Sequence, residues 1–335
     1  MSSNGRDAVG EALEKRRSST AERIKELKAK LEVAEQLCDD KACVFATGSF
    51  GRREASEHSD LDVFIVGDGT RKKPALGALD QIIVKADLIE AVRAMKIQDF
   101  SGGGEYLKHY TVEELISSLG TPDDDASNTF TTRLLLLLES SSLLGDQVYR
   151  RTTNTVIAAY WRDYEDHKND FMPTFLSNDI LRMWRTFCVN YEAFTQTDPP
   201  AKKAKRKLKN YKLKHSRLLT CYSGLLYLLA LYVENKTVSP TDAVTMVDLT
   251  PTQRLEWLLK QQHLKSAHAI IERLISRYDE FLSRTDEPED QLVERFMHKE
   301  ESVKFAKVGF ELGDTVLEAL DAIGAGNRFR RFLIV

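Results

Sequence analysis

The apolar and polar positions of this chain follow two different periods. Residues 43–49 and 61–67 are short apolar runs bounded by glycine and polar residues, which predicts two β-strands. Residues 6–38, 74–96 and 128–144 place apolar residues three and four positions apart, which predicts amphipathic helices. After about residue 150 the pattern is helical throughout. We therefore expect an α+β chain, with a small mixed sheet flanked by helices and then an all-helical region.

Turn and cap signals divide this pattern further. The alternating stretch EYLKHY, residues 105–110, suggests a third strand, and Thr111 after it is expected to cap a helix. Pro122 and the three aspartates that follow predict a surface loop that caps the next helix. The predicted organisation is a helical segment over 1–40, a sheet domain over 41–147 and a helical domain over 148–335.

Two aspartates open the second predicted strand. Asp60 and Asp62 are separated by one residue, so strand alternation points both side chains the same way, roughly 6.5–7 Å apart along the backbone. We expect Leu61, Phe64 and Val66 on the opposite side, against a core. Two adjacent carboxylates repel each other unless a cation lies between them. Mg²⁺ suits such a pair, because it takes one or two protein carboxylates together with substrate phosphates.

A glycine-rich turn lies between the two strands. Gly48-Ser49-Phe50-Gly51 directly follows the first strand. Glycine lets backbone N–H groups approach a phosphate closely, and a helical turn after it favours negative charge. Ser49 adds a hydroxyl, while Arg52 and Arg53 add positive charge. The sequence therefore predicts a phosphate-binding turn, with Gly48, Ser49 and Arg52 as nucleotide ligands, facing a metal-binding pair.

Together these residues resemble a known signature. Gly48-Ser49, ten residues and then Asp60-Leu61-Asp62 resemble the motif of the DNA polymerase β-like nucleotidyltransferase superfamily. The fuller pattern GSFGRRE…SDLD is similar to that of bacterial protein uridylyl- and adenylyltransferases and of stand-alone bacterial nucleotidyltransferases. An ordinary hairpin with a polar edge would leave the paired aspartates and the Gly-Ser turn unexplained.

This resemblance implies a reaction and its cofactors. It implies a palm-like domain that moves a nucleoside monophosphate from an NTP or dNTP to a hydroxyl and releases pyrophosphate. Two Mg²⁺ or Mn²⁺ ions would bind at Asp60 and Asp62. A third carboxylate, from a later strand, would help to position or deprotonate the hydroxyl and would also bind metal. Glu105 is the first candidate for it, Asp99 the second and Asp87 the third; the alternative for each is an exposed acid.

A strongly basic stretch stands out in the second half of the chain. Residues 202–217 contain nine Lys or Arg, in a chain whose net charge is −3. On a helix, Lys205, Lys209, Lys212 and Ser216 would share one face. The stretch can be a solvated face or a track for nucleic-acid phosphates. The resemblance implies a third interpretation, in which Lys209, Lys212 and Ser216 bind the triphosphate.

Other features restrict the class of protein. The four cysteines form no CxxC pair, which argues against a zinc site or disulfide framework and suits a reducing cytosol. The polar amino terminus is unlike a signal peptide, and no apolar run reaches the ~18 residues that span a bilayer. We expect a cytoplasmic protein without membrane insertion. Oligomerisation stays open, as does whether the tail NRFRRFLIV, residues 327–335, docks on the core or on a partner.

The acceptor of the reaction also stays open. A nucleotide acceptor would give an oligonucleotide product or signal, as in bacterial antiviral defence. RNA or protein acceptors would suit a toxin–antitoxin or regulatory role. The competing class is a non-catalytic module that binds a nucleotide or a partner protein, but such a module has no need of two aligned carboxylates.

Overall fold

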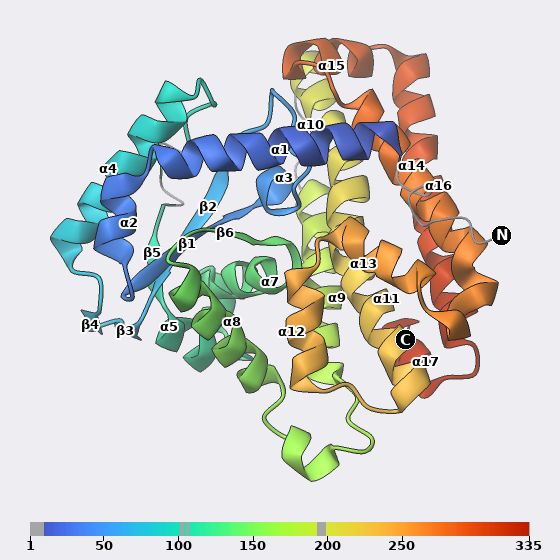
Figure 1. Ribbon diagram of the computed structural model, residues 1–335. Helices are drawn as coiled ribbons and strands as arrows, with labels where there is room; N and C mark the ends of the chain where they lie inside the picture. Colours follow the sequence, from blue (N-terminus) through green and yellow to red (C-terminus); the bar gives the residue numbers. More distant parts are fainter. Residues whose placement is uncertain (1–9, 101–103, 105–106, 193–198, 335) are drawn as a thin grey trace. The chain divides into compact units, whose positions relative to one another are not determined.

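The fold is described from a computed structural model (Figure 1). The described residues are 10–100, 104, 107–192 and 199–334. The chain forms two compact units, and each is described by itself. The sheet unit comprises residues 15–162 and 243–250, and the helical unit comprises residues 1–14, 163–242 and 251–335. The division of the chain at 40 and 147 stays a prediction.

The elements up to residue 162 belong mainly to the sheet unit. They are α1 (Glu11–Ala29), α2 (Glu32–Cys38), β1 (Ala42–Thr47), α3 (Gly48–Gly51), β2 (Asp62–Gly67), β3 (Gly69–Thr70), β4 (Lys73–Pro74), α4 (Ala78–Ala94), β5 (His109–Thr111), α5 (Val112–Ser117), α6 (Asp123–Ala126), α7 (Thr129–Glu139), β6 (Ser141–Leu144) and α8 (Asp146–Tyr160). The later elements are helical: η2 (Tyr164–His167), α9 (Thr174–Glu192), α10 (Pro200–Lys212), η3 (Leu213–Arg217), α11 (Leu218–Asn235), α12 (Pro240–Asp248), α13 (Pro251–Leu259), η4 (Gln262–Ala267), α14 (His268–Arg284), α15 (Glu289–Met297), α16 (Lys299–Gly324) and α17 (Arg328–Ile334).

The larger sheet has the strand order β5-β2-β1-β6. β1 pairs antiparallel with β2 and with β6, whereas β5 runs parallel to β2. In the β1–β2 register Thr47 lies opposite Asp62 and Phe45 lies opposite Phe64. This small mixed sheet with flanking helices, followed by a helical region, confirms the α+β prediction.

The two faces of the sheet bury different side chains. Leu61, Val63 and Ile65 pack with apolar residues of α1, α2 and α4 in one core. Phe64 lies on the other face, where its ring centroid is 5.6 Å from that of Phe45. The expectation that Phe64 and Val66 oppose the aspartates was therefore wrong, because even-numbered residues of β2 share the face of Asp62.

The predicted carboxyl end of the helix expected over residues 128–144 was also wrong. α7 ends at Glu139, and residues 141–144 form the edge strand β6 on β1. Leu143 and Leu144 are buried there. A leucine-rich segment has no strong strand signal of its own, so pairing with the open edge of β1 decides its conformation.

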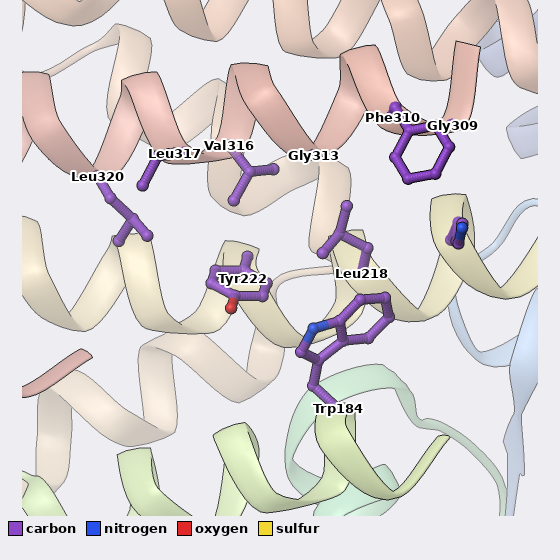
Figure 2. Close-up of a pocket in the computed structure, with 10 residues that line it drawn as sticks. Trp184, Leu218, Tyr222, Gly309, Phe310, Gly313, Val316, Leu317 and Leu320 are labelled. Carbon is purple, nitrogen blue, oxygen red and sulfur yellow. The ribbon is translucent and has the colours of Figure 1, made fainter. Parts of the chain in front are cut away.

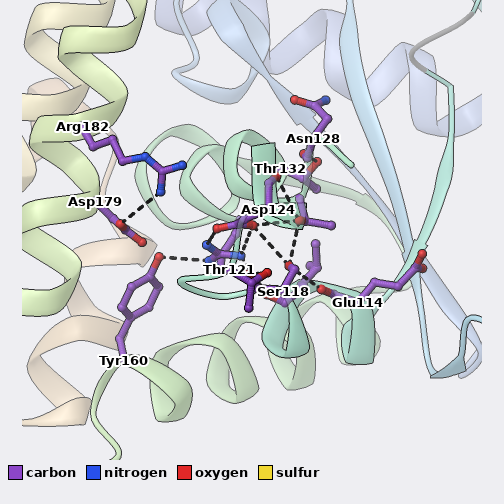
Figure 3. Close-up of polar contacts among 12 residues, drawn as sticks. Glu114, Ser118, Thr121, Asp124, Asn128, Thr132, Tyr160, Asp179 and Arg182 are labelled. Atoms are coloured by element: carbon purple, nitrogen blue, oxygen red, sulfur yellow. Dashed lines mark hydrogen bonds and ion pairs between the residues drawn. The ribbon is translucent and has the colours of Figure 1, made fainter. Parts of the chain in front are cut away.

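The acidic segment after Pro122 is not a surface loop. Asp124 is fully buried and forms an ion pair with Arg133 of α7, whose side chain is also 0% exposed (Figure 3). Arg133 further donates to the Leu115 carbonyl at 2.8 Å and to the Tyr160 hydroxyl at 3.0 Å. A buried charge requires such partners, so this network fixes α5, α6, α7 and α8 against one another. Thr111 caps α5 in a capping box with Glu114, as predicted.

The helical unit is built around α11, which contacts α9, α13, α16 and α17. The helix Pro200–Asn235 could cross a membrane by length and composition alone, but 78% of its apolar window is buried within the structure. The carboxyl-terminal tail docks on this unit. Phe329 is fully buried, and Arg328 Nε donates to the Tyr232 hydroxyl at 2.8 Å.

A buried histidine lies where α10 passes into the π-helical segment η3. His215 is 0% exposed, stacks on Phe281 with ring centroids 4.5 Å apart, and bonds the Tyr211 carbonyl through Nδ1 at 2.8 Å. Its Nε2 has no hydrogen-bond partner among the described residues. Burial lowers the pKa of His215 from 6.5 to about 4, since the apolar site disfavours the charged ring.

We expect the free energy of unfolding to fall as the pH falls from about 6.5 to about 4. In this window the unfolded chain binds a proton at His215 that the folded chain does not, which lowers stability by up to about 3 kcal/mol. Urea unfolding at several pH values would measure the loss. His215→Phe should reduce the slope in this window and leave the share of His109, whose pKa burial also lowers to about 4. An unchanged slope in that variant would contradict the assignment.

Candidate active site

The predicted carboxylate pair lies at the start of β2. Asp60 and Asp62 are both exposed, while Leu61 between them is 2% exposed and packs in the sheet core. Because Leu61 is buried in the core while Asp60 and Asp62 face solvent, both carboxylates are held at one end of the sheet. The predicted alternation of the two aspartates with Leu61 is therefore confirmed.

The Gly-Ser turn lies directly beside this pair. The β1–β2 pairing sets Thr47 opposite Asp62, so the next residue, Gly48, begins α3 against the Asp62 side chain. Gly48 has a positive φ of 62°, and a Cβ added there would lie 3.0 Å from Asp62 Oδ2. Glycine satisfies both requirements, because it adopts this conformation freely and lets the backbone approach the carboxylate.

We expect Gly48→Ala to impair catalysis much more than folding. The left-handed conformation costs a non-glycine residue about 1–2 kcal/mol, and the new methyl group would push against Asp62 Oδ2. Pyrophosphate release should therefore fall at least tenfold while far-UV circular dichroism is retained. Gly77→Ala is the matched control, since a Cβ there would meet only Asp80, at 3.7 Å. Equal activity of the two variants would contradict this role of Gly48.

A buried ion network holds the turn from behind. The Gly48 N–H donates to Glu139 Oε1 at 3.1 Å, and Arg52 donates to Glu139 Oε2 at 2.8 Å and to Glu54 Oε2 at 3.0 Å. Arg52, Glu54 and Glu139 are 7%, 1% and 2% exposed. The predicted phosphate ligand Arg52 thus has two carboxylate partners inside the protein. Arg53, next to it, is exposed.

Glu139 was not among the predicted site residues. It ends a run of five leucines, residues 134–138, so a charge stands in an otherwise apolar segment at the carboxyl end of α7. A carboxylate opposes the helix dipole there and is seldom buried without a cation. This combination is the signal that could have identified Glu139 as the partner of a buried arginine.

The candidates for the third carboxylate have different surroundings. Asp99 is exposed and bonds Arg93 at 3.0 Å, and that hydrogen bond lowers the pKa of Asp99. Asp87 Oδ2 accepts from the Ala34 N–H at 2.9 Å and so links α4 to α2. Glu105 lies outside the described residues. β5 runs parallel to β2, so both strands begin at the same end of the sheet, which is the end that carries Asp62.

The side chains at the site can be compared with the ligands that a divalent metal requires. Among the described residues, no group of three or more His, Cys, Asp or Glu could hold a metal ion. Asp60 and Asp62 supply only carboxylate oxygens and are open to solvent. Such a set fits Mg²⁺, which keeps waters and takes further oxygens from substrate phosphates.

The remaining predicted ligands belong to the helical unit. Lys209 is exposed on α10, whereas Lys212 at the end of α10 and Ser216 within η3 are half-buried. Lys205 on the same helix forms an ion pair with Glu289 of α15 at 2.6 Å. The hydrogen bond from Lys205, together with the charges of Lys212 and Lys209, lowers the pKa of Glu289. Contacts of Lys209, Lys212 and Ser216 with a nucleotide stay a prediction.

Residues 24–118 match the family model described as a nucleotidyltransferase domain. The matched range contains β1, the Gly48 turn, both aspartates and β5, whereas α7 with Glu139 lies beyond it. No curated protein and no solved structure matches the chain. The matched range thus includes the turn and both aspartates, while their roles as ligands stay a prediction.

Proposed function

Residues 24–118 form a nucleotidyltransferase domain of the DNA polymerase β-like superfamily, and on this premise we propose a specific reaction. The chain is a nucleotidyltransferase. In the proposed reaction, it transfers a nucleoside monophosphate from an NTP or dNTP to an acceptor hydroxyl and releases pyrophosphate. The observation that carries this proposal is the close approach of Gly48 to the exposed carboxylate of Asp62.

The residues of the turn bind and orient the triphosphate. Ser49 is half-buried in the turn and offers a hydroxyl, and the exposed Arg53 offers a cation. The Gly48 N–H is held by Glu139, so the contribution of Gly48 is to let the phosphates lie close to Asp62. Arg52 acts indirectly, because its ion pairs with Glu54 and Glu139 keep the turn in place.

Enzymes of this family typically use divalent metals. We assign Asp60 and Asp62 as the residues that would hold Mg²⁺ or Mn²⁺ together with the nucleotide phosphates. Bound there, the metal would activate the acceptor hydroxyl and neutralise charge on the leaving pyrophosphate. The acceptor oxygen bonds the α-phosphorus as the bond to the bridging oxygen of the β-phosphate breaks. The hydroxyl proton passes to a base, for which Glu105 is the first candidate.

The acceptor substrate is less well defined than the nucleotide substrate. The basic helix α10 favours an anionic molecule, so a nucleotide or an RNA end suits the chain better than a neutral acceptor. A nucleotide acceptor would yield an oligonucleotide, consistent with a signalling role in bacterial defence. A protein acceptor, and a module that only binds nucleotide, are the alternatives that an experiment must separate.

The proposal is tested by incubating the whole chain with each NTP and dNTP in the presence of Mg²⁺ or Mn²⁺. Pyrophosphate release and α-³²P-labelled product are measured without acceptor, with added RNA and with added protein extract. Label free in solution, on RNA or on a polypeptide identifies the acceptor. Asp62→Asn is the inactive control. Nucleotide binding without pyrophosphate in any mixture would overturn the proposal in favour of the binding module.

A further inference from the structure

An exposed apolar stripe runs along α16 on the helical unit. Val303, Phe310 and Leu317 are 61%, 61% and 50% exposed, although all three are large apolar residues. They recur every seven residues, and the small residues Ala306 and Gly313 lie between them. This is the a/d pattern of a coiled-coil seam, in which such positions are covered by a second helix.

The stripe adjoins the face that α16 packs against its own unit, where Phe305, Leu312 and Val316 are buried. Lys214 Nζ of the same unit lies over the Phe310 ring, 4.3 Å from its centroid. A pocket of about 300 Å³ borders the stripe, with Phe310, Gly313 and Leu317 on α16 and with Trp184 and Tyr222 on α9 and α11 (Figure 2). Figure 2 shows these three α16 residues above the helix that carries Leu218 and Tyr222.

The charges that flank the stripe change sign along the helix. Lys307 is exposed in its amino-terminal half, and Asp314 is exposed in its carboxyl-terminal half. Lys304 and Glu318 are exposed as well, but they form ion pairs within the chain, with Glu301 and with Arg273. Lys307 has a side chain that is 78% exposed, and within the described part of the chain its ion-pair partner is Glu311, at 3.9 Å. Two such helices side by side in opposite directions would set Lys307 of each helix beside Asp314 of the other.

We propose that α16 is the interface of a homodimer, in which it packs antiparallel against α16 of a second copy. In this arrangement Phe310 faces Gly313 of the second copy and Leu317 faces its Ala306, so these two large residues each meet a small one. Val303 lies at the end of the seam, opposite Leu320 of the second copy. Lys307 then lies beside Asp314 of the second copy. Asp321, which would approach Glu300 of the second copy, is already paired with Arg330 through a hydrogen bond of 2.8 Å.

The same seam does not suit a parallel pair. Parallel packing in register sets Phe310 against Phe310 and Gly313 against Gly313, which leaves crowding in one layer and a void in the next. A two-fold antiparallel interface makes every favourable contact twice, as is usual for homodimers.

The dimer is tested by sedimentation of the whole chain from about 1 to about 100 µM, where a short helical interface is expected to dissociate. The mass should rise with concentration toward twice the 38.1 kDa of one chain. Gly313→Glu should raise the dissociation constant at least tenfold, because it sets a charge against Phe310. A Cβ at Gly313 meets nothing within 4 Å in the single chain, so the monomer should fold normally.

Charge variants give a second, independent test. Lys307→Glu and Asp314→Lys should each weaken association, and the double variant should restore it, because the swapped charges are again complementary. Ile82→Glu, at a residue that is 62% exposed on α4, is the matched control and should not change association. A single-chain mass at every concentration would overturn the proposal. So would a double charge variant that is as weak as the single ones.

Discussion

Replacing Asp62 with Asn is expected to reduce nucleotidyl transfer by on the order of a thousandfold or more. The substitution keeps the size of the side chain but removes the charge that faces the Gly48 turn and the proposed metal. Asp60→Asn should have a similar effect. Both side chains are exposed, so neither variant should lose much stability.

The measurement is pyrophosphate release at saturating metal, with circular dichroism to confirm the fold. Glu57→Gln is the matched control, because Glu57 is an exposed acid in the same loop but outside the pair. It should retain near-normal activity. If both aspartate variants stayed active, the carboxylate pair would have no role in the reaction.

Replacing Glu139 with Ala should be the most damaging substitution behind the site. It leaves Arg52 buried with one carboxylate and removes the acceptor of the Gly48 N–H. Losing one partner of a buried ion pair costs about 3–5 kcal/mol, so denaturant midpoints should fall strongly. The turn would also lose its support, so activity per folded molecule should fall as well.

Two further variants separate stability from positioning. Glu139→Gln keeps an amide oxygen for the Gly48 N–H but removes the charge, so it should recover part of the activity. Asp124→Asn removes a charge from the other buried ion pair, with Arg133, where both side chains are 0% exposed. It should be destabilised similarly, yet each folded molecule should keep its kcat. Equal kcat losses in Asp124→Asn and Glu139→Ala would show that Glu139 has a purely structural role.

Local sequence was sufficient to predict the arrangement of the aspartates and of the glycine turn. Asp60, Leu61 and Asp62 follow strand alternation, and the Gly-Ser turn occupies a position that only glycine fills easily. Both features depend on neighbours a few residues apart, so period and turn chemistry reveal them. The same holds for the α+β class and the Thr111 cap.

Contacts between segments that are distant in the sequence decided the remaining features of the fold and the site. Residues 141–144 became β6 because β1 offered an open edge, and Asp124 became buried because Arg133 needed a partner. Arg52 turned inward because Glu139, 87 positions away, supplies a carboxylate behind the turn. The identity of a residue does not reveal such a distant partner, since the energy of a buried charge depends on the groups that surround it in the fold. The sequence by itself therefore determined the alternating aspartates and the glycine turn beside them. Only the tertiary structure decided that Arg52 and Glu139 support this turn from inside the protein.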